Sequence, residues 1–594
     1  MNIDKLFGAD SSAKRPLRLE TEASITKPQG RRSLLADLVL VLALAGLLMV
    51  ILNVADEWKA PFQAETEIDL SFWKLPQYTL YSLARGWVAL GLSFVFSILY
   101  ASWAYYDQKA RTVLLPALDI LQSIPVLGFM PGLVLALVTL FPKSNFGLEL
   151  ACVLMIFTAQ VWNMVFSYYD ALKGVPDEFR QMGKLCHFGP LQRFLKIELP
   201  FAAQGLIYNC MVSMAGGWFF LTINEAFTLG DKNFQLPGLG SYMSVAISRD
   251  NVPAQIAAVV AMGLMIVAMD RLVWWPLVIW SRKFKIEDVA GAPLETTLVQ
   301  RMLTAARLPR ALSTGGALLR RTSAGLGRGH YRLVSGAVSR GSSIRVKNLL
   351  YFVALAAVLA LGVYGLYGLF SLIAEVDLGE WLLIISSTAA TFLRVFAALV
   401  LSSLWTIPVG VWIGLNPSIS RFLQPVIQFA ASFPAPMLYP VVFGWVLAIG
   451  GNLGWGAVVL MMLGAQWYIL FNVAAGAQSI PADMLSCADV FKIGNWNRWR
   501  YFILPAIFPF LVTGWITSAG GAWNASIVAE YVQQGGQRYN AFGLGDLISQ
   551  ATGQGRFDVL AAAVLVMALT VVTINRILWR RLQRIGDYYC RFGG

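Results

Sequence analysis

Long apolar runs separated by short polar segments dominate the pattern of residues along this chain. Each run is close to the roughly 20 residues that an α-helix needs to cross the hydrocarbon core of a bilayer. The pattern therefore predicts an all-α integral membrane protein with about 12 transmembrane helices. The runs lie at 34–54, 80–103, 114–141, 147–168, 202–226, 253–280, 348–374, 382–414, 421–449, 454–475, 507–531 and 557–579.

The two halves of the chain repeat each other, with six runs in each half. Matching residues stand 309 positions apart up to the third run and 305 positions apart after it. Both halves start on the same side of the membrane, which predicts two parallel six-helix repeats related by an axis along the membrane normal. The matched pairs include Arg85 and Arg394, Ser123 and Ser432, Pro125 and Pro434, Pro131 and Pro440, Gly189 and Gly494, Pro200 and Pro505, Glu225 and Glu530, and Gly-Leu-Gly at 238–240 and 543–545.

This duplication predicts the organisation of the chain. We expect an N-terminal cytoplasmic segment at 1–33, a first repeat at 34–280, a basic linker at 281–347, a second repeat at 348–582 and a C-terminal tail at 583–594. The first apolar run lacks a small-residue cleavage site, so we expect an uncleaved anchor.

Composition and charge agree with this interpretation. Of the 594 residues, 57% are hydrophobic and 13% are charged, whereas soluble domains carry about 25% charged residues. The formal net charge is +13, and the linker from Arg282 to Lys347 holds thirteen basic and three acidic residues. The positive-inside rule favours a solvated cytoplasmic connector there, over contact with lipid head groups or nucleic acid. Lipid is the expected surrounding, and no nucleic-acid partner is expected.

Charge also predicts the orientation. The segment before the first run is basic, and the segment 55–78 after it is acidic. Since basic loops stay inside, both termini and the loops at 169–201 and 476–506 are expected in the cytoplasm.

Several kinds of chemistry are disfavoured. The five cysteines have no C-x-x-C spacing and the chain has two histidines, so we expect neither a metal site nor a catalytic residue set. No G-x-x-x-x-G-K-[ST] sequence occurs, so the chain has no phosphate-binding loop of that type. If ATP drives this protein, a partner must bind it.

Each predicted loop between the fourth and fifth runs of a repeat carries a related sequence. These are VPDEFRQMGKLCHFGPLQRFLKIELP at 175–200 and IPADMLSCADVFKIGNWNRWRYFILP at 480–505. Both resemble the EAA loop of ATP-binding-cassette (ABC) importer permeases: E-A-A, three residues, glycine, nine residues, then I-x-L-P. The E-A-A positions fall on Gln181, Met182 and Gly183 and on Ser486, Cys487 and Ala488. The motif glycine falls on His187 and Lys492, and the tails end at Pro200 and Pro505.

The resemblance implies a type I ABC importer permease fold, of the nitrate, sulfonate and taurine branch. It implies a fused, duplicated permease in the bacterial inner membrane that takes a small anion from a periplasmic or extracellular solute-binding protein. Two ABC ATPase subunits would dock on the two loops, using ATP and Mg²⁺ that this chain does not bind. The residues expected to contact them are Gln181, Met182, Gly183, His187, Phe188, Gly189, Ser486, Ala488, Lys492, Ile493 and Gly494. The alternative from another class is a secondary transporter or channel, which would need ion-coupling carboxylates near mid-membrane.

Charged residues inside the runs are candidates for function because they are costly in a membrane. Arg85, Arg394, Glu225 and Glu530 recur between the repeats, and we interpret the two arginines as the only repeated cations in the runs. Two hypotheses remain open: each arginine pairs with the glutamate of its own repeat as an outer gate, or the arginines face the axis and attract an anion. Five other charged residues are expected to be solvated at the interface, namely Asp37, Asp119, Glu149, Asp270 and Arg271.

Prolines and glycines add two further expectations. Pro125, Pro131, Pro434 and Pro440 break helical hydrogen bonding in the third and ninth runs, which favours positions along the central pathway over mere packing kinks. In the loops, His187 and Lys492 are poorly suited to the positive φ of the motif glycine. We therefore predict that the turn has moved two residues onward, to Gly189 and Gly494.

Overall fold

The computed structural model describes residues 46, 49, 53–61, 66–122, 124–230, 232–284, 360, 362–534 and 537–589. All of them belong to one compact unit, which comprises 46–295 and 338–594. The predicted N-terminal segment, most of the first run, about half of the seventh run and almost all of the basic linker lie outside the described residues.

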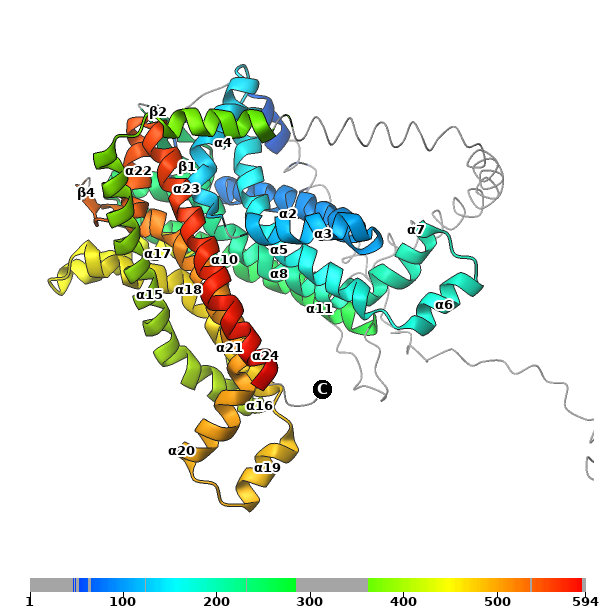
Figure 1. The fold of residues 1–594 in the computed structure, drawn as a ribbon. Helices are drawn as coiled ribbons and strands as arrows, with labels where there is room; N and C mark the ends of the chain where they lie inside the picture. The colour runs from blue at the N-terminus through cyan, green and yellow to red at the C-terminus, as the bar shows by residue number, and fades with distance from the viewer. Residues whose placement is uncertain are drawn as a thin grey trace, which may run out of the picture. The chain divides into compact units, whose positions relative to one another are not determined.

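The first repeat consists of long helices joined by shorter elements (Figure 1). In chain order these are η2 (Phe72–Lys74), α2 (Leu75–Tyr106), α3 (Gln108–Leu121), α4 (Val126–Leu140), α5 (Phe146–Gly174), α6 (Asp177–Leu185), α7 (Pro190–Arg193), η3 (Phe194–Glu198), α8 (Leu199–Asn224), β1 (Ala226–Leu229), β2 (Lys232–Gln235), α9 (Leu239–Ser248), α10 (Val252–Met269), η4 (Asp270–Trp274), α11 (Trp275–Ser281) and η5 (Arg282–Phe284).

The second repeat has the same order of elements. These are α15 (Leu378–Leu415), α16 (Pro417–Ser432), α17 (Ala435–Ala448), α18 (Leu453–Gln478), α19 (Ala482–Val490), α20 (Asn495–Arg498), η6 (Trp499–Ile503), α21 (Leu504–Ala529), β3 (Tyr531–Gln534), β4 (Gln537–Asn540), α22 (Leu544–Gln554), α23 (Phe557–Ile574), η7 (Asn575–Trp579) and α24 (Arg580–Tyr589). The segments η3, η4, η6 and η7 are single π-helical turns within longer helices.

The chain is an all-α membrane protein whose described residues contain eight helices long and apolar enough to span a bilayer. They correspond to eight of the twelve predicted runs. The third and ninth runs were wrongly predicted as continuous spans. Each divides into two helices at a proline, α3 and α4 at Pro125, and α16 and α17 at Pro434. The bend between α16 and α17 is 88°, because proline disfavours helical backbone in the residue before it.

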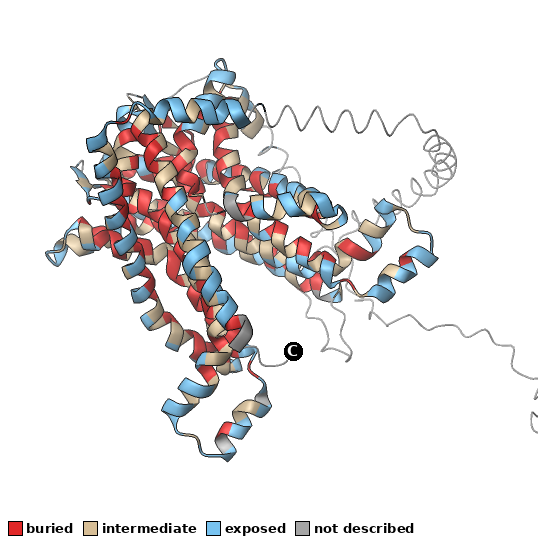
Figure 2. Cartoon of the chain, in the orientation of Figure 1, coloured by how far each residue is buried: buried red, intermediate tan, exposed pale blue. Residues whose placement is uncertain are grey.

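Within each repeat the core forms around the fourth run. Helix α5 packs against α2 and α8, and α18 packs equivalently against α15 and α21. Buried residues line these contacts, whereas α6, α7, α19 and α20 carry mostly exposed or half-buried residues (Figure 2). Two antiparallel hairpins, β1–β2 and β3–β4, follow α8 and α21. The apolar pattern did not predict them, since strands of four residues are too short to show alternation.

Candidate functional site: a duplicated buried ion pair and two exposed loops

An arginine and a glutamate from distant parts of the first repeat form a buried ion pair. Nη1 of Arg85 lies 2.7 Å from Oε1 of Glu225, and the two side chains are 1% and 0% exposed. The hydroxyl of Ser82 donates to the same oxygen at 2.6 Å. Burial of a charge is costly unless it is paired and hydrogen-bonded, so this contact ties α2 to the end of α8. The geometry is that of the pairing hypothesis, and the role as an outer gate stays a prediction.

The Gly-Leu-Gly sequence completes the surroundings of Glu225. The β1–β2 hairpin returns the chain to this glutamate, and the Gly240 N–H donates to Oε2 at 2.7 Å. The carboxylate thus lies at the start of α9, where the helix dipole favours negative charge. A Cβ on Gly238 would lie 2.3 Å from the carboxylate carbon, and one on Gly240 would lie 2.5 Å from the Thr222 carbonyl. The glycines are therefore required by close packing.

The second repeat builds the same cluster from equivalent residues. Nη1 of Arg394 lies 2.7 Å from Oε1 of Glu530, and the Gly545 N–H donates to Oε2 at 2.8 Å. Thr391 takes the place of Ser82, with its hydroxyl donating to the carboxylate at 2.9 Å. Four matched residues in each repeat therefore meet, although they are distant along the chain.

Glu149 makes the two clusters unequal. The sequence interpretation expected it to be solvated at the interface, but its side chain is 0% exposed and pairs with Arg85. Its carboxylate accepts Nε at 2.7 Å and Nη2 at 2.6 Å. At the equivalent place in the second repeat, Arg394 Nε donates to the backbone carbonyl of Gly454 at 3.3 Å. Among the described residues, Arg85 thus forms ion pairs with two carboxylates, whereas Arg394 forms an ion pair with one.

The expected ATPase-contacting loops form two exposed helical hairpins. In the first, α6 ends in a Schellman motif: the Phe188 N–H donates to the Gly183 carbonyl at 2.9 Å, and the His187 N–H donates to the Lys184 carbonyl at 3.0 Å. In the second, the Ile493 N–H donates to the Ala488 carbonyl at 3.0 Å. The turn residues are His187, at φ 53°, and Lys492, at φ 49°.

The prediction that the turn moves to the later glycines is therefore wrong. Gly189 has φ −66° and Gly494 has φ −59°, which any residue adopts, and no atom lies within 4 Å of where their Cβ would be. The backbone keeps the turn at the motif position and tolerates a side chain there. In the first loop, Nδ1 of His187 also lies 3.1 Å from the carbonyls of Lys184 and Leu185 at the end of α6.

The two loops are attached to the spans differently. In the first, buried Glu198 hydrogen-bonds Tyr106 and lies 2.9 Å from Nε of Arg193, whose guanidinium stacks over the Tyr106 ring. In the second, buried Ile503 stands at the position of Glu198. The sequence interpretation did not find this clamp of Glu198, Arg193 and Tyr106. The signal for it was that the repeat offset matches Glu198 of the first loop with an isoleucine, Ile503, in the second.

Of the four prolines in the third and ninth runs, two lie at breaks between helices and two lie inside the helices that follow. Pro125 and Pro434 precede α4 and α17, and Pro131 and Pro440 are buried within those helices. Asn524 of the second repeat caps the first break, accepting the Val126 N–H at 2.8 Å. The first break is therefore satisfied by a side chain of the other repeat, and a role of the prolines along the pathway stays a prediction.

Comparisons with known proteins agree with the duplicated architecture. The family model described as "Binding-protein-dependent transport system inner membrane component" matches twice, at residues 93–275 and 406–584, so that each match contains one exposed loop.

Curated relatives match over about a third of this chain. The bicarbonate transport system permease protein CmpB of Synechococcus elongatus is 28% identical over 198 residues, 33% of this chain and 67% of that protein. The nitrate import permease protein NrtB of Leptolyngbya laminosa is 26% identical over 190 residues, 32% of this chain and 64% of that protein. The taurine transport system permease protein TauC of Escherichia coli is 26% identical over 197 residues, 33% and 68% of the two chains.

A solved chain of the MetNI methionine ABC transporter, in an inward-facing crystal form, matches with 19% identity and a TM-score of 0.30. That match covers 36% of this chain and 99% of the solved one.

Proposed function

The chain belongs to the family of inner membrane components of binding-protein-dependent transport systems, and on that premise we propose that it imports a small anion. It acts as a fused pair of permease halves, and partner subunits hydrolyse ATP with Mg²⁺. A solute-binding protein delivers the anion from outside, and the loops and both termini face the cytoplasm.

The observation that carries this proposal is the pair of exposed hairpins at equivalent places in the two repeats. Each presents a large apolar side chain to solvent at the end of its first helix: Leu185 is 81% exposed and Val490, its equivalent, is 77% exposed. A group of exposed apolar side chains is typical of a protein-binding surface, and the hairpins carry further ones at Leu191, Phe491 and Trp496. Two surfaces in one chain fit two ATPase subunits.

The anionic substrate class is supported by the relatives, whose names refer to bicarbonate, nitrate and taurine. Each of these solutes carries an oxyanion group. The proposal extends that common feature to this chain, without choosing among the three.

The test introduces a charge into each apolar contact. Leu185→Asp and Val490→Asp are expected to weaken ATPase binding by about tenfold or more, because a buried carboxylate would lack a partner in the interface. Leu185→Met is the matched control and should bind normally. Binding is measured by co-purification and titration with the cognate ATPase, and function by ATP-dependent uptake of labelled nitrate, bicarbonate and taurine into proteoliposomes.

Two results would reject the proposal. Uptake that continues without ATP and follows an ion gradient would identify a secondary transporter or channel. Unchanged ATPase binding by both aspartate variants would show that the hairpins are not the docking surfaces.

A further inference from the structure

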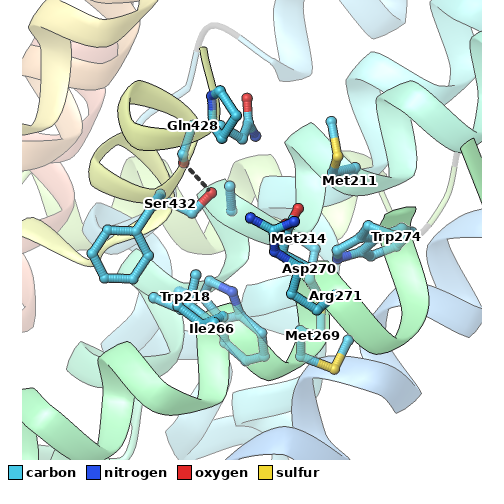
Figure 3. A pocket seen from close by; sticks show the side chains of 14 residues that line it. Met211, Met214, Trp218, Ile266, Met269, Asp270, Arg271, Trp274, Gln428 and Ser432 are labelled. Atoms are coloured by element: carbon cyan, nitrogen blue, oxygen red, sulfur yellow. Dashed lines mark hydrogen bonds and ion pairs between the residues drawn. The ribbon is translucent and has the colours of Figure 1, made fainter. Parts of the chain in front are cut away.

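A cavity lies where α8, α10 and η4 of the first repeat meet α16 of the second. Its walls are largely apolar, and Figure 3 shows them around the side chain of Arg271. The lining residues are Met211, Met214, Ala215, Trp218, Ile266, Val267, Met269, Asp270, Arg271, Trp274, Pro425, Gln428, Phe429 and Ser432. Both repeats therefore contribute to one partly open cavity.

Arg271 is the cation of this cavity, and its position in the span is costly. It belongs to the span Val252–Ser281, whose 30 residues extend about 45 Å against a hydrocarbon core of roughly 30 Å, and its Cα lies about 15 Å before the end of that span. A guanidinium at this depth is retained where it faces protein or a water-filled cavity, and such residues mark solute pathways. The side chain is nevertheless 64% exposed.

The charge of Arg271 is only weakly compensated. Within the part of the chain that the structure describes, its one ion pair is with Asp270, at 3.7 Å from Nε. By contrast, Arg85 makes two contacts of 2.6 and 2.7 Å with Glu149 and a third of 2.7 Å with Glu225. The guanidinium of Arg271 therefore keeps N–H donors for another acceptor, because Asp270 lies beyond hydrogen-bonding distance.

The local backbone explains how an arginine comes to face this space. Residues Asp270–Trp274 form a π-helical turn, and such turns recur at functional sites because they shift the side chains that follow. The second repeat has the same turn at Asn575–Trp579, and Arg576 is the residue there that corresponds to Arg271. The sequence interpretation that Arg85 and Arg394 are the only repeated cations in the runs is therefore wrong.

We propose that this cavity is a binding site for the transported anion and that Arg271 is the residue that recognises its charge. This inference rests on the proposed function and adds the site. A planar guanidinium offers paired N–H donors that match the oxygens of a small oxyanion. On the α16 side, Gln428 adds a side-chain amide, whereas the Ser432 hydroxyl already donates to the Gln428 carbonyl at 2.8 Å. The indoles of Trp218 and Trp274 form part of the apolar wall.

The neighbouring carboxylate of Asp270 lowers the affinity of such a site for an anion. A carboxylate 3.7 Å from Arg271 competes with the anion, so binding is weak. Weak binding suits a transit site, because a solute must leave as readily as it enters.

The first test measures the charge selectivity of the cavity without requiring transport. Gln428→Cys is made in a cysteine-free chain within the complete transporter in lipid nanodiscs. Its rates of modification by an anionic methanethiosulfonate carrying a sulfonate and by a cationic one carrying a trimethylammonium group are compared. Adding Arg271→Gln is expected to lower the anionic-to-cationic rate ratio about tenfold, since a unit charge in the same cavity acts oppositely on the two reagents. Arg271→Lys should keep the ratio within about twofold.

The second test measures uptake. With labelled nitrate, bicarbonate and taurine as probes, Arg271→Gln is expected to lower ATP-dependent uptake by at least about tenfold while complex assembly is retained, and Arg271→Lys should be intermediate because it lacks the paired donors. Arg576→Gln is the matched control, since Arg576 is not among the residues lining this cavity. It should change uptake less than about threefold.

The outcomes separate the two proposals. An unchanged rate ratio in Arg271→Gln, no reaction of Cys at 428 with either reagent, or equal losses of uptake in the two glutamine variants overturns the site. A tenfold fall in the ratio in a protein that takes up none of the anions supports the site and rejects anion import as the function. If Arg271→Gln does not fold, a fall in the ratio in Arg271→Met supports the site, and no fall overturns it.

Discussion

His187 and Lys492 hold left-handed backbone at the turn of each exposed hairpin, where glycine would be unstrained. A residue with a Cβ destabilises the fold by about 1–2 kcal/mol in that conformation. Replacing it by glycine removes this strain but costs about 0.5–1 kcal/mol, because glycine loses more conformational freedom on folding. His187 recovers part of the cost through Nδ1, which lies beside two carbonyls at the end of α6. We therefore expect Lys492→Gly to stabilise its loop, by up to about 1 kcal/mol, more than His187→Gly does.

Hydrogen–deuterium exchange of the Phe188 and Ile493 amides, which close the two turns, measures this effect. Protection should rise at Ile493 in Lys492→Gly and change less at Phe188 in His187→Gly. Gly189→Val and Gly494→Val should leave both amides unchanged. Lower protection of these amides in the valine variants would instead show that the turns depend on Gly189 and Gly494.

The buried glutamates provide a second prediction at the residue scale. Glu225→Gln leaves Arg85 paired with Glu149, whereas Glu530→Gln leaves Arg394 with no ion pair among the described residues. Breaking a buried pair costs about 3–5 kcal/mol, and loss of one hydrogen bond costs about 1 kcal/mol. Glu530→Gln should therefore lower the midpoint of thermal unfolding in lipid nanodiscs more than Glu225→Gln.

Equal shifts of that midpoint would indicate that Glu149 does not compensate Arg85.

An Arg85→Glu and Glu225→Arg exchange is a poor test of the pair, even though the pair is formed. The exchanged chain would place a carboxylate beside Glu149 and would remove the acceptor of the Gly240 N–H.

At the scale of elements, the clamp of Glu198, Arg193 and Tyr106 fixes α6 and α7 to the spans, and the second hairpin lacks it. Glu198→Gln is expected to weaken the first attachment by about 1–2 kcal/mol, a modest value because Arg193 is partly exposed. Amide exchange should rise in α6 and α7 and stay unchanged in α19 and α20, which act as the internal control. An equal rise in both hairpins would show that the loops move as one unit.

The broken third and ninth runs also matter at this scale. Helix α16 reaches α8 and α10 of the other repeat, and α4 reaches α21 and α23. These crossings join the repeats and form the cavity around Arg271, so the proline breaks serve the interface between repeats.

At the scale of the whole molecule, both of the hairpins that we propose as docking surfaces belong to one chain. We expect the working transporter to hold one copy of this chain and two ATPase subunits. Native mass spectrometry of the purified complex measures the ratio directly. Two copies of this chain, or a single ATPase subunit in an active complex, would contradict the pseudo-dimer.

The sequence by itself determined the features that depend on local composition. The length of the apolar runs indicates the eight long spans, and the repeat offset identifies both the duplication and the loops that each family match contains. The recurrence of Arg85 and Glu225 in the second repeat also indicated them as candidate partners of an ion pair, one of two hypotheses that the sequence left open. Each of these signals is present along the chain before any distant segments meet.

Only the tertiary structure decided which distant residues meet. The partners of Arg85 stand 64 and 140 positions away, so the pairing of Glu149 depends on how α5 packs against α2. The positive φ at His187 follows from hydrogen bonds that close α6, and these outweighed the local preference for glycine. Likewise, Arg271 lines a cavity because a helix of the other repeat lies across it, which no local pattern encodes.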